Sequence, residues 1–312
     1  MVESKHQWKA WLYLAPAIIL LLVFTVWPII NTVAMAFQNG YNALAAKRGA
    51  SFDIGIQNFI DVLGYGSFLK NLLNTMLLCV ATVPLSTMLA LLIAVALNSI
   101  KPMQKFLQTI FFLPYVTNSI AIGMVFSAMF NIIGLRPDGL QADTWGIINN
   151  VIQFFGGEPI NWINAGSGYW QYITVMIVYI VWNALPFKIL VLLGGLQAIN
   201  KQYYEAAKVD STSRTRVFFR ITVPLLSPML AYVIITGFIG GFKEYSSIVG
   251  IFGENMGPAH DVGRLNTMVG FIYDALEGDF QGRASAAALI LFAIILAVTW
   301  FNNHVIKKLV HY

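Results

Sequence analysis

The side chains best suited to catalysis or metal binding are few in this sequence and scattered along it. The four histidines are His6, His260, His304 and His311; three lie near a terminus, and none lies in the middle of a long apolar stretch. A single cysteine, Cys79, excludes a disulfide within the chain and any cysteine-based zinc site. We therefore expect no catalytic residue, no metal site and no cofactor held by this chain.

A denser group of charged and small side chains lies in the segment 200–224. In order it contains Glu205-Ala206-Ala207, Asp210-Ser211-Thr212, Arg214 and Ile221-Thr222-Val223-Pro224. Residues such as Asp210 and Ser211 stop one helix and cap the next, so two short helices are expected on either side of them. Pro224 suits the first turn of a following helix, where its missing N–H does no harm.

The composition indicates the surroundings in which this segment must work. Hydrophobic residues make up 58% of the 312 residues and charged residues only 11%, against roughly 25% charged in soluble domains. The 22 Phe, 13 Tyr and 8 Trp exclude a disordered chain, because they supply too much apolar surface. The class of protein that remains is a membrane protein with several spans.

Six charge-poor windows are long enough to cross a bilayer, which takes ~20 apolar residues. Each is interpreted as a helix, because an open sheet would leave its edge groups without hydrogen bonds in lipid. The prediction is an all-α polytopic membrane protein with a single transmembrane domain over residues 1–312. Its spans lie at about 11–37, 71–99, 106–130, 172–196, 222–243 and 284–304.

The distribution of charge orients these spans. With both termini inside, the inner segments hold eleven Lys and Arg, among them Lys5, Lys101 and Lys308, and three acids that include Glu3. The outer loops hold seven basic residues and eleven acids. Because the Lys and Arg bias sets orientation, both termini and the segment 200–224 are predicted to be cytoplasmic. The basic isoelectric point is then explained by the Lys and Arg residues that orient the spans, and no nucleic-acid partner is expected.

The segment 200–224 resembles the coupling loop of binding-protein-dependent ABC importer permeases. The family pattern is Glu-Ala-Ala, three residues, Gly, nine residues, then Ile-x-Leu-Pro. Ser211 stands in place of the Gly and Val223 in place of the Leu. If the turn needs a left-handed backbone, a non-Gly residue there costs ~1–2 kcal/mol.

The resemblance extends over nearly the whole chain and favours the carbohydrate-importer, maltose-type branch with six spans. The motifs that support this branch stand in the expected order: Leu14-Ala15-Pro16, Trp27-Pro28, Asn74-Thr75, Phe112-Leu113-Pro114, Leu185-Pro186-Phe187 and Gly195-Leu196-Gln197.

The resemblance implies a set of partners. The chain contains no Gly-x-x-x-x-Gly-Lys-Ser/Thr motif, so ATP and Mg would be bound by two ATPase subunits rather than here. A second permease, expected to be a different chain, and an extracytoplasmic solute-binding protein would complete the importer. The complex would lie in a bacterial-type plasma membrane, in contact with lipid.

Roles for individual residues follow from the same resemblance. Small residues allow close approach of another backbone, and Glu205 supplies a charge for pairing across the contact with an ATPase. The predicted coupling residues are Glu205, Ala206, Ala207, Asp210, Ser211, Arg214, Ile221 and Pro224.

The solute path is expected between the spans that precede and follow the coupling loop. A gapless count outward from Glu205 places it at Ile180, Asn183, Ala184, Phe187, Gly237, Gly240, Gly241 and Glu244. Further candidates for the solute path are Trp182, Tyr245 and Lys243. Lys188 is expected to face a water-filled cavity or a partner subunit, because a charged side chain is costly inside a bilayer.

Other classes of function remain open at this point. Glycerol phosphate or another organophosphate is the alternative solute. A transporter driven by an ion gradient is less consistent, because such proteins use intramembrane carboxylates and the spans contain none apart from Glu244 at an edge. A channel and an intramembrane enzyme have no supporting motif, and Gly166-Ser167-Gly168 is interpreted as a flexible turn.

Overall fold

The computed structural model describes residues 7–100, 104–133 and 144–307. Glu3, Lys5, Lys101 and Lys308, which enter the orientation argument, lie outside the described residues. The chain divides into two compact units, one of Met1–Leu69 with Phe271–Ala293 and one of Lys70–Gly270 with Ile294–Tyr312.

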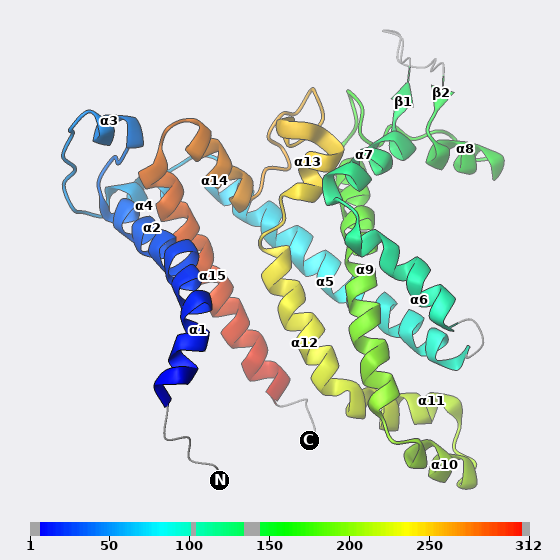
Figure 1. The fold of residues 1–312 in the computed structure, drawn as a ribbon. Coiled ribbons are helices and arrows are strands. Elements are labelled where there is room, and N and C mark those ends of the chain that lie inside the picture. The colour runs from blue at the N-terminus through cyan, green and yellow to red at the C-terminus, as the bar shows by residue number, and fades with distance from the viewer. Residues whose placement is uncertain (1–6, 101–103, 134–143, 308–312) are drawn as a thin grey trace. The chain divides into compact units, whose positions relative to one another are not determined.

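The first unit begins with a long apolar helix and contains several short ones (Figure 1). Its elements are α1 Gln7–Leu21, a π-helical turn Leu22–Val26, α2 Trp27–Phe37, α3 Ala43–Lys47 and α4 Gln57–Leu63, joined by most of α14 Met268–Glu277 and the first half of α15 Gln281–Lys307.

A buried amide organises the polar end of this unit. The Asn58 side chain donates to the carbonyl oxygens of Ala36 at 3.0 Å and Gln38 at 2.7 Å, and accepts from the Gly40 N–H at 3.1 Å. Asn42 caps α3 and also donates to the Asp279 carbonyl at 2.7 Å. These bonds hold the segments after α2 and before α15 together, because each satisfies a backbone group that no helix uses.

The second unit contains three long helices, α5, α9 and α12, and the shorter helices that connect them. Its elements are α5 Phe68–Ser99, α6 Gln104–Phe112, a 3-10 turn Leu113–Val116, α7 Ser119–Phe130, α8 Ile147–Phe154, α9 Tyr169–Ala198, α10 Lys201–Val209, α11 Arg214–Val217, a π-helical turn Phe218–Thr222, α12 Val223–Gly241, α13 Ser246–Phe252 and a 3-10 turn Gly253–Asn255. The strands β1 Ile132–Ile133 and β2 Thr144–Trp145 form one antiparallel pair, with Ile132 opposite Trp145.

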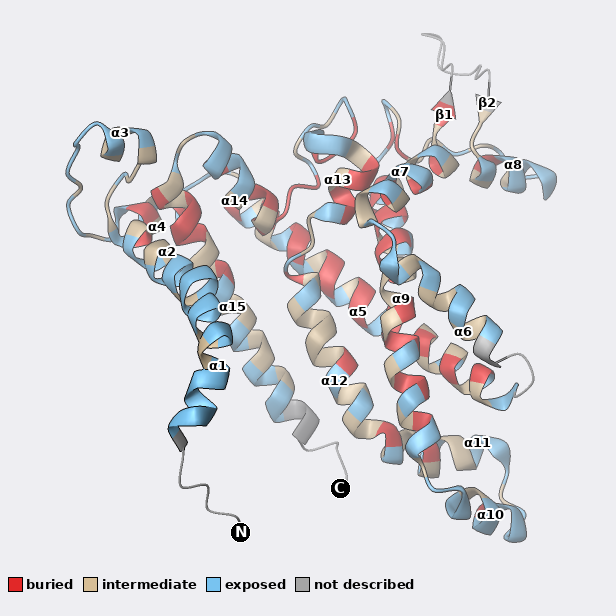
Figure 2. Ribbon diagram, viewed as in Figure 1, coloured by how far each residue is buried: buried red, intermediate tan, exposed pale blue. Residues whose placement is uncertain are grey.

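Helix α9 is the centre of the second unit and packs against α6, α7, α12 and α13. Figure 2 shows buried residues concentrated along α5, α9 and α13, whereas α1 in the other unit is exposed along nearly all of its length. One cluster of the core lies around Tyr172 and Tyr179, and another around Leu192 and Leu226. An apolar surface such as that of α1 is stable where lipid or another apolar chain covers it.

Among the described residues, five helices are long and apolar enough to cross a membrane, and a bent pair of helices brings the number to six if it is counted as one span. The bent pair corrects the prediction for 106–130, which is not one helix. The chain bends by 99° between Phe106–Val116 and Ser119–Phe130. Thr117 is extended, and the Asn118 side chain accepts from the Ile120 N–H at 2.8 Å, so Asn118 caps a new helix there.

Candidate functional site

A cavity of about 310 Å³ lies within the second unit, at the low end of the roughly 300–1,000 Å³ that ligand pockets span. All eight residues predicted for the solute path line it. Its full lining is Thr82, Val83, Ser86, Tyr115, Ile180, Asn183, Ala184, Phe187, Lys188, Val233, Thr236, Gly237, Gly240, Gly241 and Glu244. That these residues contact a solute stays a prediction.

One wall of the cavity is a single face of α9. Ile180, Asn183, Ala184 and Phe187 recur at the spacing of three and four residues that stacks side chains on one side of a helix. The Phe187 ring is stacked on Tyr115, with centroids 5.8 Å apart and planes 19° apart. The wall therefore combines a planar amide with aromatic faces.

The opposite wall is α12, whose glycines differ in what surrounds them. A Cβ at Gly241 would lie 2.7 Å from Cys79 Sγ, and one at Gly237 would lie 3.0 Å from Val83 Cγ1. These two glycines let α12 pack closely on α5. A Cβ at Gly240 would meet nothing within 4 Å, so of the three glycines only Gly240 has room for a side chain.

The glycines predict opposite outcomes for two substitutions. Gly240→Leu should fold normally and fill the cavity, reducing solute uptake roughly tenfold or more, while Gly241→Ala should destabilise the protein by ~1–3 kcal/mol through overpacking. Thermal melting and uptake measured on both variants check this. Cys79→Ala should partly restore the stability of Gly241→Ala; equal melting temperatures for the two glycine variants would contradict the assignment.

Lys188 borders the cavity, as predicted, but its ammonium group is bonded within the chain. The residue is 4% exposed. Its Nζ donates to the Val83 carbonyl at 3.1 Å, to Ser86 Oγ at 2.7 Å and to Thr87 Oγ1 at 2.9 Å. All three acceptors belong to α5, so Lys188 fastens α9 to α5. No sequence pattern indicated these partners, apart from the hydroxyl residues spaced along α5.

Glu244 lies just beyond the end of α12, where it is partly buried at the edge of the cavity. Its Oε1 accepts from the backbone N–H of Tyr245 at 3.2 Å and of Ser247 at 3.1 Å. Burial raises the pKa of the Glu244 carboxyl, and the hydrogen bonds from Ser247 and Tyr245 act against that rise. Its carbonyl oxygen accepts from Thr267 Oγ1 at 2.9 Å, which joins the site to a later loop.

Three further candidates from the sequence do not line this cavity. The Trp182 ring packs 5.1 Å from Phe126, and Tyr245 packs against the same hydrophobic cluster. Lys243 is exposed. Conversely, sequence reasoning missed lining residues from α5, from the third predicted span and from α12, because no local motif shows which face of a helix a cavity will use. The missed residues are Thr82, Val83, Ser86, Tyr115, Val233 and Thr236.

The segment 200–224 forms the two short helices expected, α10 and α11. Glu205 and Ala206 are exposed on α10, as are Asp210, Ser211 and Arg214 after it. Ala207 is 6% exposed and lines an internal hollow of about 550 Å³ together with Val95 and Phe218. Ala207 therefore packs within its own chain while Ala206 is exposed, and a contact of either residue with an ATPase stays a prediction.

The end of α10 is a Schellman motif, the hydrogen-bonded helix ending that usually has Gly in a left-handed conformation. The Ser211 N–H donates to the Lys208 carbonyl at 3.0 Å and the Thr212 N–H to the Ala207 carbonyl at 2.9 Å. Ser211 has φ of 50°, so this turn does need a left-handed residue. The family pattern places Gly where this conformation is required.

Replacing Ser211 by Gly should therefore stabilise the protein, by about 1 kcal/mol, because it removes the left-handed strain of a residue with a Cβ. The matched control is Ser213→Gly, since Ser213 has φ of −61° and gains nothing from Gly. Thermal melting of both variants measures the difference. If Ser211→Gly loses as much stability as the control variant, the claim that the backbone of Ser211 is strained is wrong.

The caps of these helices differ in part from the prediction. Asp210 is the residue that ends α10, as expected. The residue before α11 is Ser213 and not one of Asp210–Thr212, and the Ser213 side chain makes no capping hydrogen bond. Ile221 lies in the π-helical turn and Pro224 in the first turn of α12. Arg214–Gly241 forms one continuous apolar helix, so α11 leads directly into α12.

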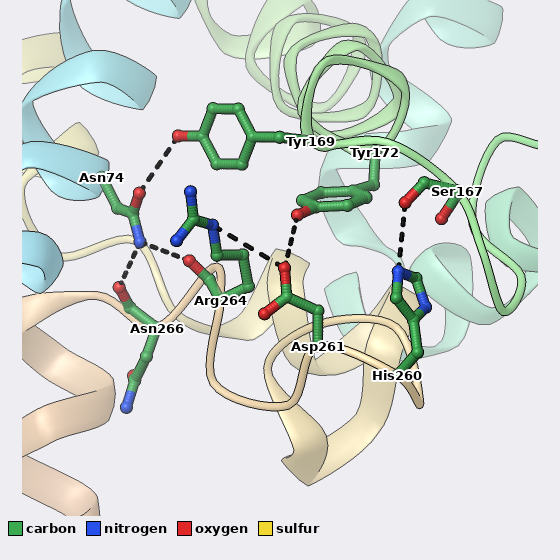
Figure 3. Close-up of polar contacts among 8 residues, drawn as sticks. All are labelled: Asn74, Ser167, Tyr169, Tyr172, His260, Asp261, Arg264 and Asn266. Carbon is green, nitrogen blue, oxygen red and sulfur yellow. Dashed lines mark hydrogen bonds and ion pairs between the residues drawn. The ribbon is translucent and has the colours of Figure 1, made fainter.

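A second polar cluster fixes the loop 256–267 against the first turns of α9 and the start of α5 (Figure 3). His260 Nδ1 accepts from the Gly166 N–H and its Nε2 faces the Ser167 carbonyl, both at 3.1 Å. Tyr172 donates to Asp261 at 3.0 Å. Gly166-Ser167-Gly168 is thus held by His260, which corrects its interpretation as a flexible turn.

The same loop is tied to α5 by an amide. The Asn74 side chain donates to the carbonyls of Arg264 at 2.8 Å and Asn266 at 3.0 Å, and accepts from Tyr169 at 3.2 Å. The Arg264 guanidinium lies 5.0 Å from the centroid of the Tyr169 ring. These contacts make the loop a fixed surface at the end of the second unit opposite α10 (Figure 1).

Comparison with known proteins decides the family. The family model described as "Binding-protein-dependent transport system inner membrane component" matches residues 86–311, which include α9, α12 and the segment 200–224. The chain belongs to this family. The predicted fold class, an all-α polytopic membrane protein of importer-permease type, is confirmed.

Individual permeases of the family are similar over nearly their full lengths. LacF, a lactose transport system permease protein of Rhizobium radiobacter, is 28% identical and covers 95% of this chain and 92% of its own. UgpA, an sn-glycerol-3-phosphate transport system permease protein of Agrobacterium fabrum, is 28% identical, with 97% and 96% covered. A solved bacterial ABC transporter involved in alginate import shares the permease fold, with a TM-score of 0.77, 21% identity and 98% of both chains covered.

Proposed function

We propose that this chain is the permease subunit of an ATP-driven ABC importer and forms half of the translocation pathway for a carbohydrate, specifically an oligosaccharide. One observation supports this above the others: the coupling segment is the covalent connection between the two cavity walls. Helix α9 ends at Ala198, α10 and α11 follow, and α12 begins at Val223. A displacement of α10 and α11 therefore reaches both walls.

The mechanism follows from that connection. Two ATPase subunits, which bind ATP and Mg, would each receive a permease coupling segment, here through the exposed face of α10 that contains Glu205, Ala206 and Val209. Closure of the ATPases would move α10 and α11 as a rigid body, and the continuous helix 214–241 would transmit the motion to α12. The cavity would then open alternately to the two sides, with ATP changing the population of the two states.

The orientation proposed is a bacterial-type inner membrane with α10 and both termini in the cytoplasm. The loop 256–267 then faces outward, where its fixed polar surface suits docking of a solute-binding protein. A second permease, a different chain in importers of this type, would supply the other half of the pathway, and lipid would cover the exposed apolar faces.

The solute class is proposed from the residues of the cavity. Sugars are bound by planar hydrogen-bonding groups and aromatic faces, and Asn183, Glu244, Tyr115 and Phe187 provide these groups. LacF supports a sugar, while UgpA keeps glycerol phosphate as the alternative. ATP hydrolysis belongs to the partners, so this chain acts as a transport subunit.

Uptake tests the proposal. A strain lacking this chain should lose uptake of one labelled oligosaccharide from a panel that also contains glycerol 3-phosphate, and the wild-type gene should restore it. Loss of glycerol 3-phosphate uptake alone would favour the alternative. Uptake that continues after the partner ATPase is inactivated would point to an ion-gradient transporter.

A further inference from the structure

The inner side of helix α8 is polar. The Asn149 side chain is buried, donates to the Ile160 carbonyl at 2.9 Å and accepts from the Ile160 N–H and the Trp162 indole N–H, both at 3.1 Å. The helix begins after Gly146, whose N–H donates to the Asn131 carbonyl at 2.9 Å. These bonds fix α8 on the end of α7 and on the loop that leads to α9. The opposite side of α8 therefore cannot turn inward unless they break.

That opposite side is apolar and exposed. It consists of Ile147, Val151, Phe154 and Phe155, which helical spacing places on one face. Phe154 is 84% exposed and Phe155 is 81% exposed, and their rings meet edge to face with centroids 5.4 Å apart. An exposed apolar patch of this kind indicates a surface that something else covers.

The place of α8 in the fold shows what lies next to it. Helix α9, Tyr169–Ala198, is an apolar span of 30 residues. Such a helix is roughly 45 Å long, about the thickness of a bilayer with its headgroup regions. The first turn of α9 therefore lies among lipid headgroups. Ile148 of α8 packs against the same hydrophobic cluster as Tyr169 and Tyr172. Figure 1 shows α8 lying across the direction of α9, at the end where α9 begins.

The residue types of the patch favour lipid over a protein partner. Residues 144–157 contain no charged side chain, and the patch lacks the polar groups that surround the apolar centre of a protein interface. A solute-binding protein that docks and leaves would return two phenyl rings to water in every cycle, whereas lipid covers them permanently. Phe and Trp are common on helices that lie in a membrane surface, and the exposed Trp170 in the first turn of α9 stands at the same level.

We propose that α8 lies in the membrane surface and anchors the second unit to phospholipid through Ile147, Val151, Phe154 and Phe155. Amphipathic helices of this kind place their apolar face ~5–10 Å into the boundary between headgroups and acyl chains. The inference goes beyond the proposed function, because it depends neither on the solute nor on the coupling to ATP.

Fluorescence quenching of one label on α8 tests the lipid contact. Phe154→Cys and, as the matched control, Gln153→Cys are made in a Cys79→Ala chain and labelled with bimane maleimide; the Cys79→Ala complex alone gives the background. Gln153 is the neighbouring exposed residue, on the polar side of α8. The importer complex is placed in nanodiscs, with a nitroxide lipid in the bilayer or iodide in the water. The ratio of lipid quenching to iodide quenching should be at least roughly fivefold higher at position 154, because only that label lies in the lipid.

Equal ratios at the two positions would overturn the inference. If iodide reaches position 154 until purified solute-binding protein is added, the patch is a docking site for that protein and the lipid contact is wrong. If neither quencher reaches position 154, the second permease covers the patch, which equally contradicts the proposal. Thermal melting of both labelled variants shows that they are folded. None of these results bears on carbohydrate uptake, which has its own test.

Discussion

Reversing the charge of Glu205 is expected to abolish ATP-dependent uptake while the complex still assembles. The residue is exposed on α10 next to Ala206 and can pair with a basic group on an ATPase. Removing one partner of a buried interfacial charge pair costs ~2–5 kcal/mol, and Glu205→Lys adds repulsion to that loss. Uptake into proteoliposomes should therefore fall to the level measured without ATP.

The matched control for Glu205→Lys is Glu277→Lys, an equal reversal of charge at an exposed position of α14. It should transport normally. Assembly is followed by co-purification of the ATPase, and thermal melting shows whether α10 remains folded. Normal uptake by Glu205→Lys would refute the coupling role of this segment.

Removing the hydroxyl groups that bind Lys188 is expected to destabilise the protein more than removing Lys188 itself. Ser86→Ala with Thr87→Val leaves the buried ammonium with the Val83 carbonyl as its one remaining partner from α5. Hydrogen bonds to charged groups contribute ~1.5–3 kcal/mol each, so the loss should be roughly 3–5 kcal/mol. Lys188→Met removes the charge together with its desolvation cost and should be nearly neutral.

The triple variant completes the cycle. Adding Lys188→Met to Ser86→Ala and Thr87→Val should restore most of the lost stability, because no buried charge then lacks partners. Melting temperatures of the complex in nanodiscs give the three values. If Lys188→Met is as damaging as the double variant, the ammonium has a role beyond fastening α9 to α5.

The coupling segment could be predicted from the sequence because it is local. The turn at Ser211, the helix ending at Val209 and the start of α12 depend on neighbours within a few residues. The left-handed conformation of Ser211 follows from the same local geometry. The surroundings of Ala207 could not be predicted, since it lines a pocket together with Val95, which lies more than a hundred residues earlier.

The cavity residues likewise divide into those that could be predicted from the sequence and those that could not. The gapless count outward from Glu205, which follows the family pattern, placed Asn183 and Gly240 among the residues that line the cavity. The contributions of Thr82 and Tyr115 required the crossing of α5 and the bend at Thr117, which are tertiary features. The apolar run around Pro114 favoured one straight span.

The central claim is most directly tested by the accessibility of one engineered thiol in the cavity. Gly240→Cys in a Cys79→Ala chain places the sole cysteine at a position that borders open space. In sealed vesicles, a membrane-impermeant maleimide applied from each side should label it from one side without ATP and from the other when ATP is trapped with vanadate. Glu205→Lys should prevent this exchange. Labelling from the same side at the same rate in both nucleotide states would contradict coupling between α10 and the cavity.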